Sequence, residues 1–182
     1  MLAILQGEFF WGIIIGLILS VVGGWALAKF TVHMQTENAK KTVVYFCMDT
    51  IKNIQSIISD MDSTRDKAKA IHHDYLNLID IEIQIYGRNR EHLIHLSDDT
   101  RNLVRNYMNA IAIKKAEISK NLDLFYQINA MADRAQAEGR GPEAQRFRAE
   151  ASVPLVAAQL AADKIVTASK DGNHIIQDLS RL

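Results

Sequence analysis

The stretch Val44–Met61, VYFCMDTIKNIQSIISDM, places apolar side chains at alternating spacings of three and four residues. Such spacing gathers them on one face of an α-helix, as in the a/d seam of a coiled coil. The seam consists of Val44, Cys47, Ile51, Ile54, Ile58 and Met61. It is short for a coiled coil, so packing within the bundle of a single chain explains it equally well. Either arrangement predicts a helix.

Upstream of this seam, residues 9–28 form a run without a single charged side chain. A helix of that length spans about 30 Å, the thickness of a bilayer's hydrocarbon core. Trp11 and Trp25 lie near its ends, where indole rings favour the lipid–water boundary. A buried helix of a soluble protein rarely stays uncharged for so long. A cleaved signal peptide would begin with basic residues, which residues 1–8 lack. We therefore expect a retained transmembrane helix.

The charges that flank this helix predict its orientation. Lys29, Lys40 and Lys41 follow it, whereas Glu8 is the only charged residue before it. Because basic residues stay on the cytoplasmic side, residues 1–8 are expected outside and the body inside. The expected location is the cell (inner) membrane, with one pass. Cys47 fits the reducing cytoplasm.

Within the predicted transmembrane helix, small residues recur at every fourth position. They are Gly12, Gly16, Ser20, Gly24 and Ala28. Small side chains let two helix backbones approach closely in lipid, where packing replaces the hydrophobic effect as the source of contact energy. The stripe predicts self-association. Incidental small residues or a different membrane partner are the alternatives.

The rest of the chain is also predicted to be helical. After the juxtamembrane helix, residues 29–62, a second helix is expected over about 64–86, with Ser63 and Asp66 in capping-box spacing. Within it, residues 79–85 alternate apolar and polar side chains, which is typical of a strand. No other segment offers a pairing strand, so helix is preferred. The alternative is a short strand pairing between protomers.

Two further helices follow a connection that runs from Gly87 to Ser97. Ser97-Asp98-Asp99 is a strong helix start, which predicts a helix over about 98–138. The Gly139–Pro142 segment ends it and begins a helix over about 142–181. Pro154 is expected to kink or restart this helix near Ser152, and Asp171-Gly172-Asn173 to break it again.

Composition excludes several classes of function. The 182 residues carry 21 basic and 21 acidic side chains, so the basic excess of a general nucleic-acid coat protein is missing. One cysteine excludes an intrachain disulfide framework and a Cys-rich zinc site. The sequence contains no phosphate-binding glycine loop, no nucleophilic serine elbow and no zinc-protease helix motif. We expect no enzymatic activity and no cofactor.

A few polar residues are weak candidates for chemistry. His92 and His95 have the spacing of two metal ligands on one helix, but further ligands are missing, so an exposed linker is the preferred interpretation and no metal site is predicted. The basic residues around the Gly139–Pro142 turn are possible contacts for an anion or ligand, with solvated side chains as the alternative. They are Arg134, Arg140, Arg146 and Arg148.

Residues 85–113 carry a resemblance. An aromatic residue in Ile85-Tyr86-Gly87, a short linker, an acidic cap and the helix start Asn102-Leu103-Val104-Arg105-Asn106-Tyr107 resemble a stretch of uncharacterised bacterial single-pass membrane proteins with a small helical cytoplasmic domain. Gly87, His92 and His95 depart from that pattern. The resemblance implies a membrane anchor followed by helices, and no activity.

Together these observations predict an all-α chain: one N-terminal transmembrane helix, then a three- to four-helix bundle or coiled coil, with residues 63–182 as the bundle domain. The expected function is a membrane-anchored, self-associating scaffold or signalling module. Its expected partners are the lipid bilayer, further copies of the chain and a protein that binds the cytoplasmic helices; no nucleic acid is expected. The alternative is an oligomeric, channel-like or membrane-disrupting effector.

Overall fold

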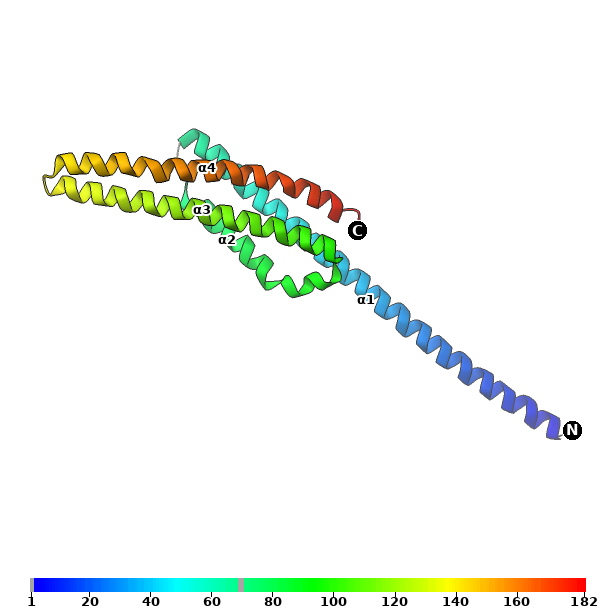
Figure 1. The fold of residues 1–182 in the computed structure, drawn as a ribbon. Coiled ribbons are helices and arrows are strands. Elements are labelled where there is room, and N and C mark those ends of the chain that lie inside the picture. Colours follow the sequence, from blue (N-terminus) through cyan, green and yellow to red (C-terminus); the bar gives the residue numbers. More distant parts are fainter. Residues whose placement is uncertain (1, 69–70) are drawn as a thin grey trace. The chain divides into compact units, whose positions relative to one another are not determined.

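A computed structural model of the chain describes residues 2–68 and 71–182, and the side chains of residues 22–66 and 71–182. Every regular element in these residues is a helix (Figure 1). The elements are α1 (Leu2–Ala68), α2 (His73–Arg88), the short 3₁₀ helix η1 (Arg90–His95), α3 (Asp98–Ala137) and α4 (Gly141–Leu179). The prediction of an all-α fold is confirmed.

The chain divides into two compact units, residues 1–42 and 43–182. The first unit is formed by α1 alone. Gly12, Gly16 and Ser20, together with most of the predicted transmembrane helix, lie outside the residues whose side chains the structure describes. Within the described residues, no helix combines the length and the apolar character that crossing a bilayer requires. Large apolar side chains are nevertheless exposed along the described part of this unit: Val22, Trp25, Leu27, Phe30, Val32 and Met34.

The second unit begins at Val43, so its core includes the apolar seam of α1. Cys47, Ile51 and Ile54 have no exposed surface. All six seam residues, 44–61, belong to one buried cluster that also contains residues of α2, α3 and α4. The seam therefore packs within the chain's own bundle, one of the two arrangements that its spacing allowed. Its side chains are not available for the expected coiled coil with a second copy, and residues 43–62 belong to the bundle domain.

The end of α1 lies later than expected. Met61 is buried, and the Arg65 guanidinium lies 2.5 Å from the Asp62 carboxylate one turn earlier. These interactions stabilise the helical conformation across Ser63 and Thr64, where the sequence suggested a helix start. The expected capping box is wrong: α1 continues to Ala68 and α2 begins at His73.

The alternating segment at 79–85 lies within α2 and is helical. Residues four apart on a helix are about 40° apart around its axis, and residues two apart are about 200° apart. Ile79 and Ile83 therefore face the core, whereas Ile81 and Ile85 are exposed on the opposite side. The alternation thus gives a helix with two apolar faces, and the strand alternative is wrong for this chain.

α3 and α4 lie side by side as an antiparallel hairpin (Figure 1). The hydroxyl of Ser97 accepts a hydrogen bond of 3.3 Å from the Thr100 amide, which confirms the predicted start of α3. Gly139 has φ +76°, a conformation that favours glycine, and it makes the turn between the helices. Small side chains line much of their contact; the buried alanines include Ala132, Ala135, Ala144, Ala151, Ala158 and Ala162.

α4 is more regular than expected. It includes Pro154 without restarting near Ser152, and it continues through Asp171, Gly172 and Asn173 to Leu179. The predicted break at these three residues is wrong. Gly172 is buried at a point where another helix passes, so packing outweighs its low intrinsic helix propensity.

Candidate functional site

A polar contact between distant parts of the body lies where α1 passes α4. The Gln55 side chain of α1 donates a hydrogen bond of 2.7 Å to the backbone carbonyl of Ser169 and one of 3.1 Å to the Asn173 side chain. A Cβ atom on Gly172 would lie 2.7 Å from Ile51 Cγ2 and 2.8 Å from Gln55 Nε2. The two helices therefore approach closely here because residue 172 has no side chain.

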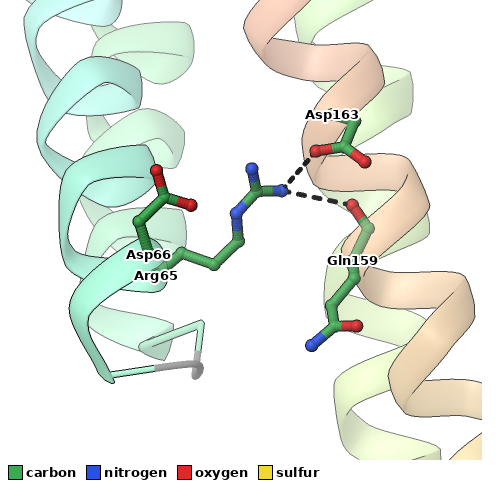
Figure 2. A pocket seen from close by; sticks show the side chains of 4 residues that line it. All are labelled: Arg65, Asp66, Gln159 and Asp163. Atoms are coloured by element: carbon green, nitrogen blue, oxygen red, sulfur yellow. Dashed lines mark hydrogen bonds and ion pairs between the residues drawn. The ribbon is translucent and has the colours of Figure 1, made fainter.

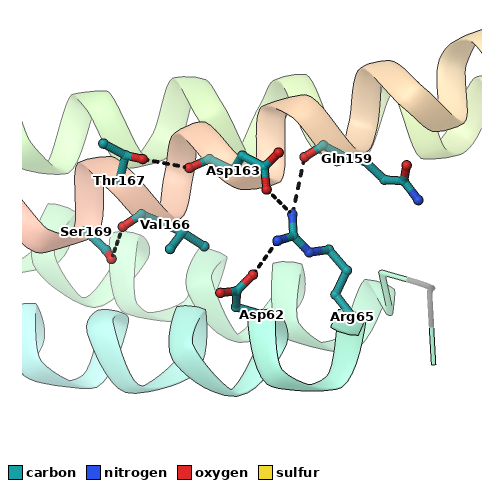
Figure 3. Close-up of polar contacts among 7 residues, drawn as sticks. All are labelled: Asp62, Arg65, Gln159, Asp163, Val166, Thr167 and Ser169. Carbon is teal, nitrogen blue, oxygen red and sulfur yellow. Dashed lines mark hydrogen bonds and ion pairs between the residues drawn. The ribbon is translucent and has the colours of Figure 1, made fainter. Parts of the chain in front are cut away.

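Three turns further along α1, Arg65 makes the second polar link to α4. One guanidinium nitrogen lies 2.7 Å from the Asp163 carboxylate and 3.3 Å from the Gln159 carbonyl oxygen, and another lies 2.5 Å from Asp62 (Figure 3). The Arg65 side chain is only 16% exposed, whereas that of Asp163 is 60% exposed. We call Asp62, Arg65, Gln159 and Asp163 the Arg65 cluster.

Two shallow grooves border this cluster. One, of about 380 Å³, is lined by Arg65, Asp66, Gln159 and Asp163 (Figure 2). The other, of about 370 Å³, includes Gln55, Asp62 and Asn173 among its lining residues. The cation of Arg65 spans the space between α1 and α4, as the view in Figure 2 shows. Arg65, Asp163, Gln55 and Asn173, which line the grooves, thus bond across the space between the two helices.

Other polar links join the remaining helices. Lys115 of α3 lies 2.6 Å from the Asp80 carboxylate of α2. Asn53 of α1 donates a hydrogen bond of 3.2 Å to Glu82 of α2. These contacts tie α2 to α3 and α1, and they involve two of the polar residues that alternate with its isoleucines, Asp80 and Glu82.

A third groove, of about 410 Å³, lies between α3 and α4. Its rim carries Asp171, His174 and Asp178, and Leu103 and Tyr107 contribute apolar surface. The Tyr107 hydroxyl is buried without a hydrogen-bond partner among the described residues. Burial and then the nearby Asp171 carboxylate raise its pKa above the ordinary value, so this tyrosine stays protonated.

The single thiol of the chain is also buried in this body. Burial raises the pKa of Cys47 from 9.0 to about 11. Tyr86 has a raised pKa as well, because of burial and then the proximity of Cys47. Since the thiolate is the reactive form, a raised pKa and full burial make Cys47 a packing residue.

The contacts described above show which kinds of chemistry the side chains of the body can support. Within the described residues, no three side chains of His, Cys, Asp or Glu come together in a way that could hold a metal ion. The Arg65 cluster joins two helices through charge-assisted hydrogen bonds, which are strong when formed and which competing ions weaken. It is an electrostatic connection between α1 and α4.

Comparison of the chain with protein-family models, with curated proteins and with solved structures finds no match. The interpretation of the site therefore depends on its geometry.

The four arginines near the α3–α4 turn are all exposed. Arg140 is paired with Glu138 and Glu143, Arg146 with Glu150 at 2.8 Å, and Arg148 with Asp133 at 3.7 Å. Three of the four candidate anion contacts are thus engaged by neighbouring carboxylates. This is the arrangement expected of solvated surface arginines.

Two members of the small-residue stripe fall in the part of α1 whose side chains the structure describes. Gly24 and Ala28 are exposed, and no atom lies within 4 Å of a Cβ placed on Gly24. This side of the helix is open. The proposed role of the stripe in self-association stays a prediction.

Sequence reasoning missed the residues that connect α1 to α4, namely Gln55, Arg65, Asp163 and Gly172. A local signal existed for two of them. Asp62 and Arg65 have the spacing of an ion pair within one helix turn. A single glycine inside a helical pattern, such as Gly172, often marks a close helix approach. Asp163, the partner of Arg65 in α4, had no local signal, because it lies 98 residues away in the sequence.

Proposed function

We propose that the chain is a membrane-anchored, self-associating helical scaffold or signalling module without enzymatic activity. Its anchor is the segment 9–28, and its body, residues 43–182, resides in the cytoplasm of the cell. The partners are the bilayer of the cell (inner) membrane, further copies of the chain and a protein that contacts the cytoplasmic helices.

One observation carries the anchor. Large apolar side chains are exposed in the last turns of this segment, at Val22, Trp25 and Leu27, and the exposure continues just beyond it at Phe30, Val32 and Met34. Water solvates such a surface poorly, whereas lipid covers a helix from every side. The Lys29 ammonium also lies 4.9 Å from the centre of the Trp25 ring. This pairing of an indole and a cation is typical of the boundary between lipid and cytoplasm.

The body supports a relay or scaffold role. α1 supplies both the anchor segment and half of the contact with α4, through Gln55 and Arg65. Because Asp163, the partner of Arg65 on α4, is exposed, a change in the packing of α1 would break and reform their ion pair. A protein partner on the cytoplasmic side would bind one of the two packing arrangements of α1 in preference to the other.

Membrane fractionation tests the anchor. The full chain is expected to remain in the membrane pellet after an alkaline wash, and a chain that starts at residue 29 is expected in the supernatant. A full chain that is released by the wash would contradict the anchor.

The mass of the detergent-solubilised particle tests self-association. We expect more than one copy in each particle, and fewer copies when Gly12 and Gly16 are replaced by Leu, because the larger side chains separate the helices. Ile18→Leu is the matched control and should leave the mass unchanged. A monomeric wild-type particle would overturn the proposal. Ion flux into vesicles that disappears in the Gly16→Leu variant would instead favour the channel.

A further inference from the structure

The outer face of α2 is an apolar stripe that nothing in the described structure covers. Its side chains are Leu78, Ile81 and Ile85, which are 46%, 50% and 37% exposed. The opposite face of the same helix already packs into the core through Leu76, Ile79 and Tyr86. One apolar face is enough to pack a helix into a bundle, so α2 carries a second apolar face that the bundle does not require.

The stripe continues at both ends with opposite charges. Asp74 lies four residues before Leu78, and Arg88 lies three residues after Ile85. The full series, residues 74, 78, 81, 85 and 88, has the four–three spacing of a helix-packing seam. Asp74 and Arg88 are exposed, and among the described residues neither forms an ion pair within the chain.

This charge pattern complements itself in one orientation only. In an antiparallel pair of α2 helices centred near Ile81, Asp74 of each copy lies opposite Arg88 of the other, and Leu78 packs near Ile85. A parallel pair would instead bring Asp74 against Asp74 and Arg88 against Arg88, which is unfavourable. The neighbouring exposed side chains, Asn77 and Gln84, are neutral and add no repulsion.

We propose that the outer face of α2 binds the same face of a second copy of this chain in an antiparallel, two-fold pair. The inference deepens the proposed function and rests on it in taking another copy as the partner. This contact lies outside the membrane. The coiled-coil seam of α1 cannot form a contact between copies there, because its residues are buried.

The size of the contact sets its strength. α2 has 16 residues, so the paired helices are about 24 Å long. Such a contact buries less than the roughly 1,200–2,000 Å² of a stable interface, and the pair is weak and reversible. A weak contact of this kind suits a module that changes its packing.

Cysteine cross-linking tests the pairing in the full chain. In the Ile81→Cys variant, the two copies of residue 81 lie next to each other, so mild oxidation of the detergent-solubilised full chain is expected to give a disulfide-linked dimer. The native Cys47 is fully buried and does not compete. Ile113→Cys on α3 is the matched control, because Ile113 is also an exposed isoleucine, at 64%, and it should give little dimer. Equal dimer from the two variants would overturn the proposal.

Charge exchange tests the orientation. In the Ile81→Cys background, Asp74→Arg alone and Arg88→Asp alone should each reduce the dimer several-fold, since each places like charges opposite one another twice. The double variant should restore it. Failure of the double variant to restore the dimer would contradict the antiparallel arrangement, because only that arrangement brings residue 74 of one copy to residue 88 of the other.

The outcome is distinguishable from that of the proposed function. Particles that contain several copies but give no dimer through residue 81 would overturn the α2 contact and leave the self-associating scaffold standing. A chain that the alkaline wash releases, but that still gives the dimer through residue 81 and responds to charge exchange, would overturn the anchor and support the α2 contact.

Discussion

At the scale of single residues, Gly172 shows how a small side chain determines a helix crossing. It lies within a continuous helix, so no turn requires glycine there. The space for a Cβ atom is instead filled by Ile51 and Gln55 of α1 and by the Tyr107 hydroxyl, which would lie 3.1 Å from it. Ile51 is fully buried and cannot move aside. The contact between α1 and α4 therefore depends on the absence of a side chain at this position.

This dependence predicts that Gly172→Ala destabilises the chain relative to Gly87→Ala. Both variants replace a helical glycine and gain helix propensity, up to about 1 kcal/mol in a helix interior and less at Gly87, which lies in the last turn of α2. Only the first overpacks a crossing, at a cost of about 1–3 kcal/mol. A Cβ atom on Gly87 has no neighbour within 4 Å. Urea unfolding of the two variants should differ by about that cost, and equal stabilities would show that α1 does not approach α4 so closely.

Cys47 gives a prediction about pH. Its pKa rises from 9.0 to about 11 on burial, so between these values the unfolded chain loses the thiol proton while the folded chain keeps it. The stabilising contribution of the neutral thiol is present below pH 9 and is lost as the pH rises towards 11. At about 1.4 kcal/mol per pKa unit, the loss is on the order of 2–3 kcal/mol.

The Cys47→Ala variant should therefore show a shallower decrease of the unfolding free energy between pH 9 and pH 11 than the wild type. The difference in slope is the measurement, because the lost volume shifts the variant's stability equally at every pH. Parallel curves over this range would show that the thiol is accessible to water in the folded chain.

At the scale of elements, the Arg65 cluster holds the end of α1 on α4. Arg65 contacts two carboxylates and a carbonyl oxygen and is largely buried, unlike an ordinary surface ion pair. Arg146 makes a single exposed pair with Glu150 and serves as the matched control.

We expect Arg65→Met to lower the unfolding free energy by about 1–2 kcal/mol, because the hydrophobic stem is kept while the charge-assisted hydrogen bonds are lost. Arg146→Met should change it by less than about 0.5 kcal/mol, the usual value of an exposed helix pair. The effect at Arg65 should shrink in high salt. Similar small effects at both positions would mean that the cluster contributes no net stability.

The sequence predicted an element correctly where a residue of that element itself determines its start or its end. Ser97 caps α3 with its own side chain, and Gly139 ends the hairpin turn with its own φ angle. Where prediction failed, a distant contact had decided the structure. α1 continues past Ser63 because Met61 and Arg65 are held by the body, and α4 continues through Gly172 because α1 passes there.

The alternation at 79–85 shows a different limit. Its period of two is the same whether a strand or a two-faced helix produces it, and only the position of Ile79 in the core distinguishes them. The apolar stripe on the outer face of α2 is visible in the sequence once the helix is established. The Arg65 cluster is not, because its partners on α4 have the same residue types as an ordinary solvated face.

At the scale of the whole molecule, residues 43–182 form a unit with their own core. We predict that this fragment folds without the first 42 residues and unfolds in one cooperative transition, because every member of the buried cluster lies within it. Circular dichroism during thermal unfolding is the measurement. A helical but non-cooperative fragment would show that the core needs the preceding part of α1.

The contacts of α1 also determine when the body can complete its folding during synthesis. Gln55 and Arg65 are made early, whereas their partners Asn173 and Asp163 follow 118 and 98 residues later. At about 5–20 residues per second, a ribosome needs roughly 5–24 s to reach them. Throughout that interval the apolar face of α1 has no α4 to cover it. The hairpin of α3 and α4 forms from neighbouring segments, so the nascent chain can complete its body only when the final helix leaves the ribosome.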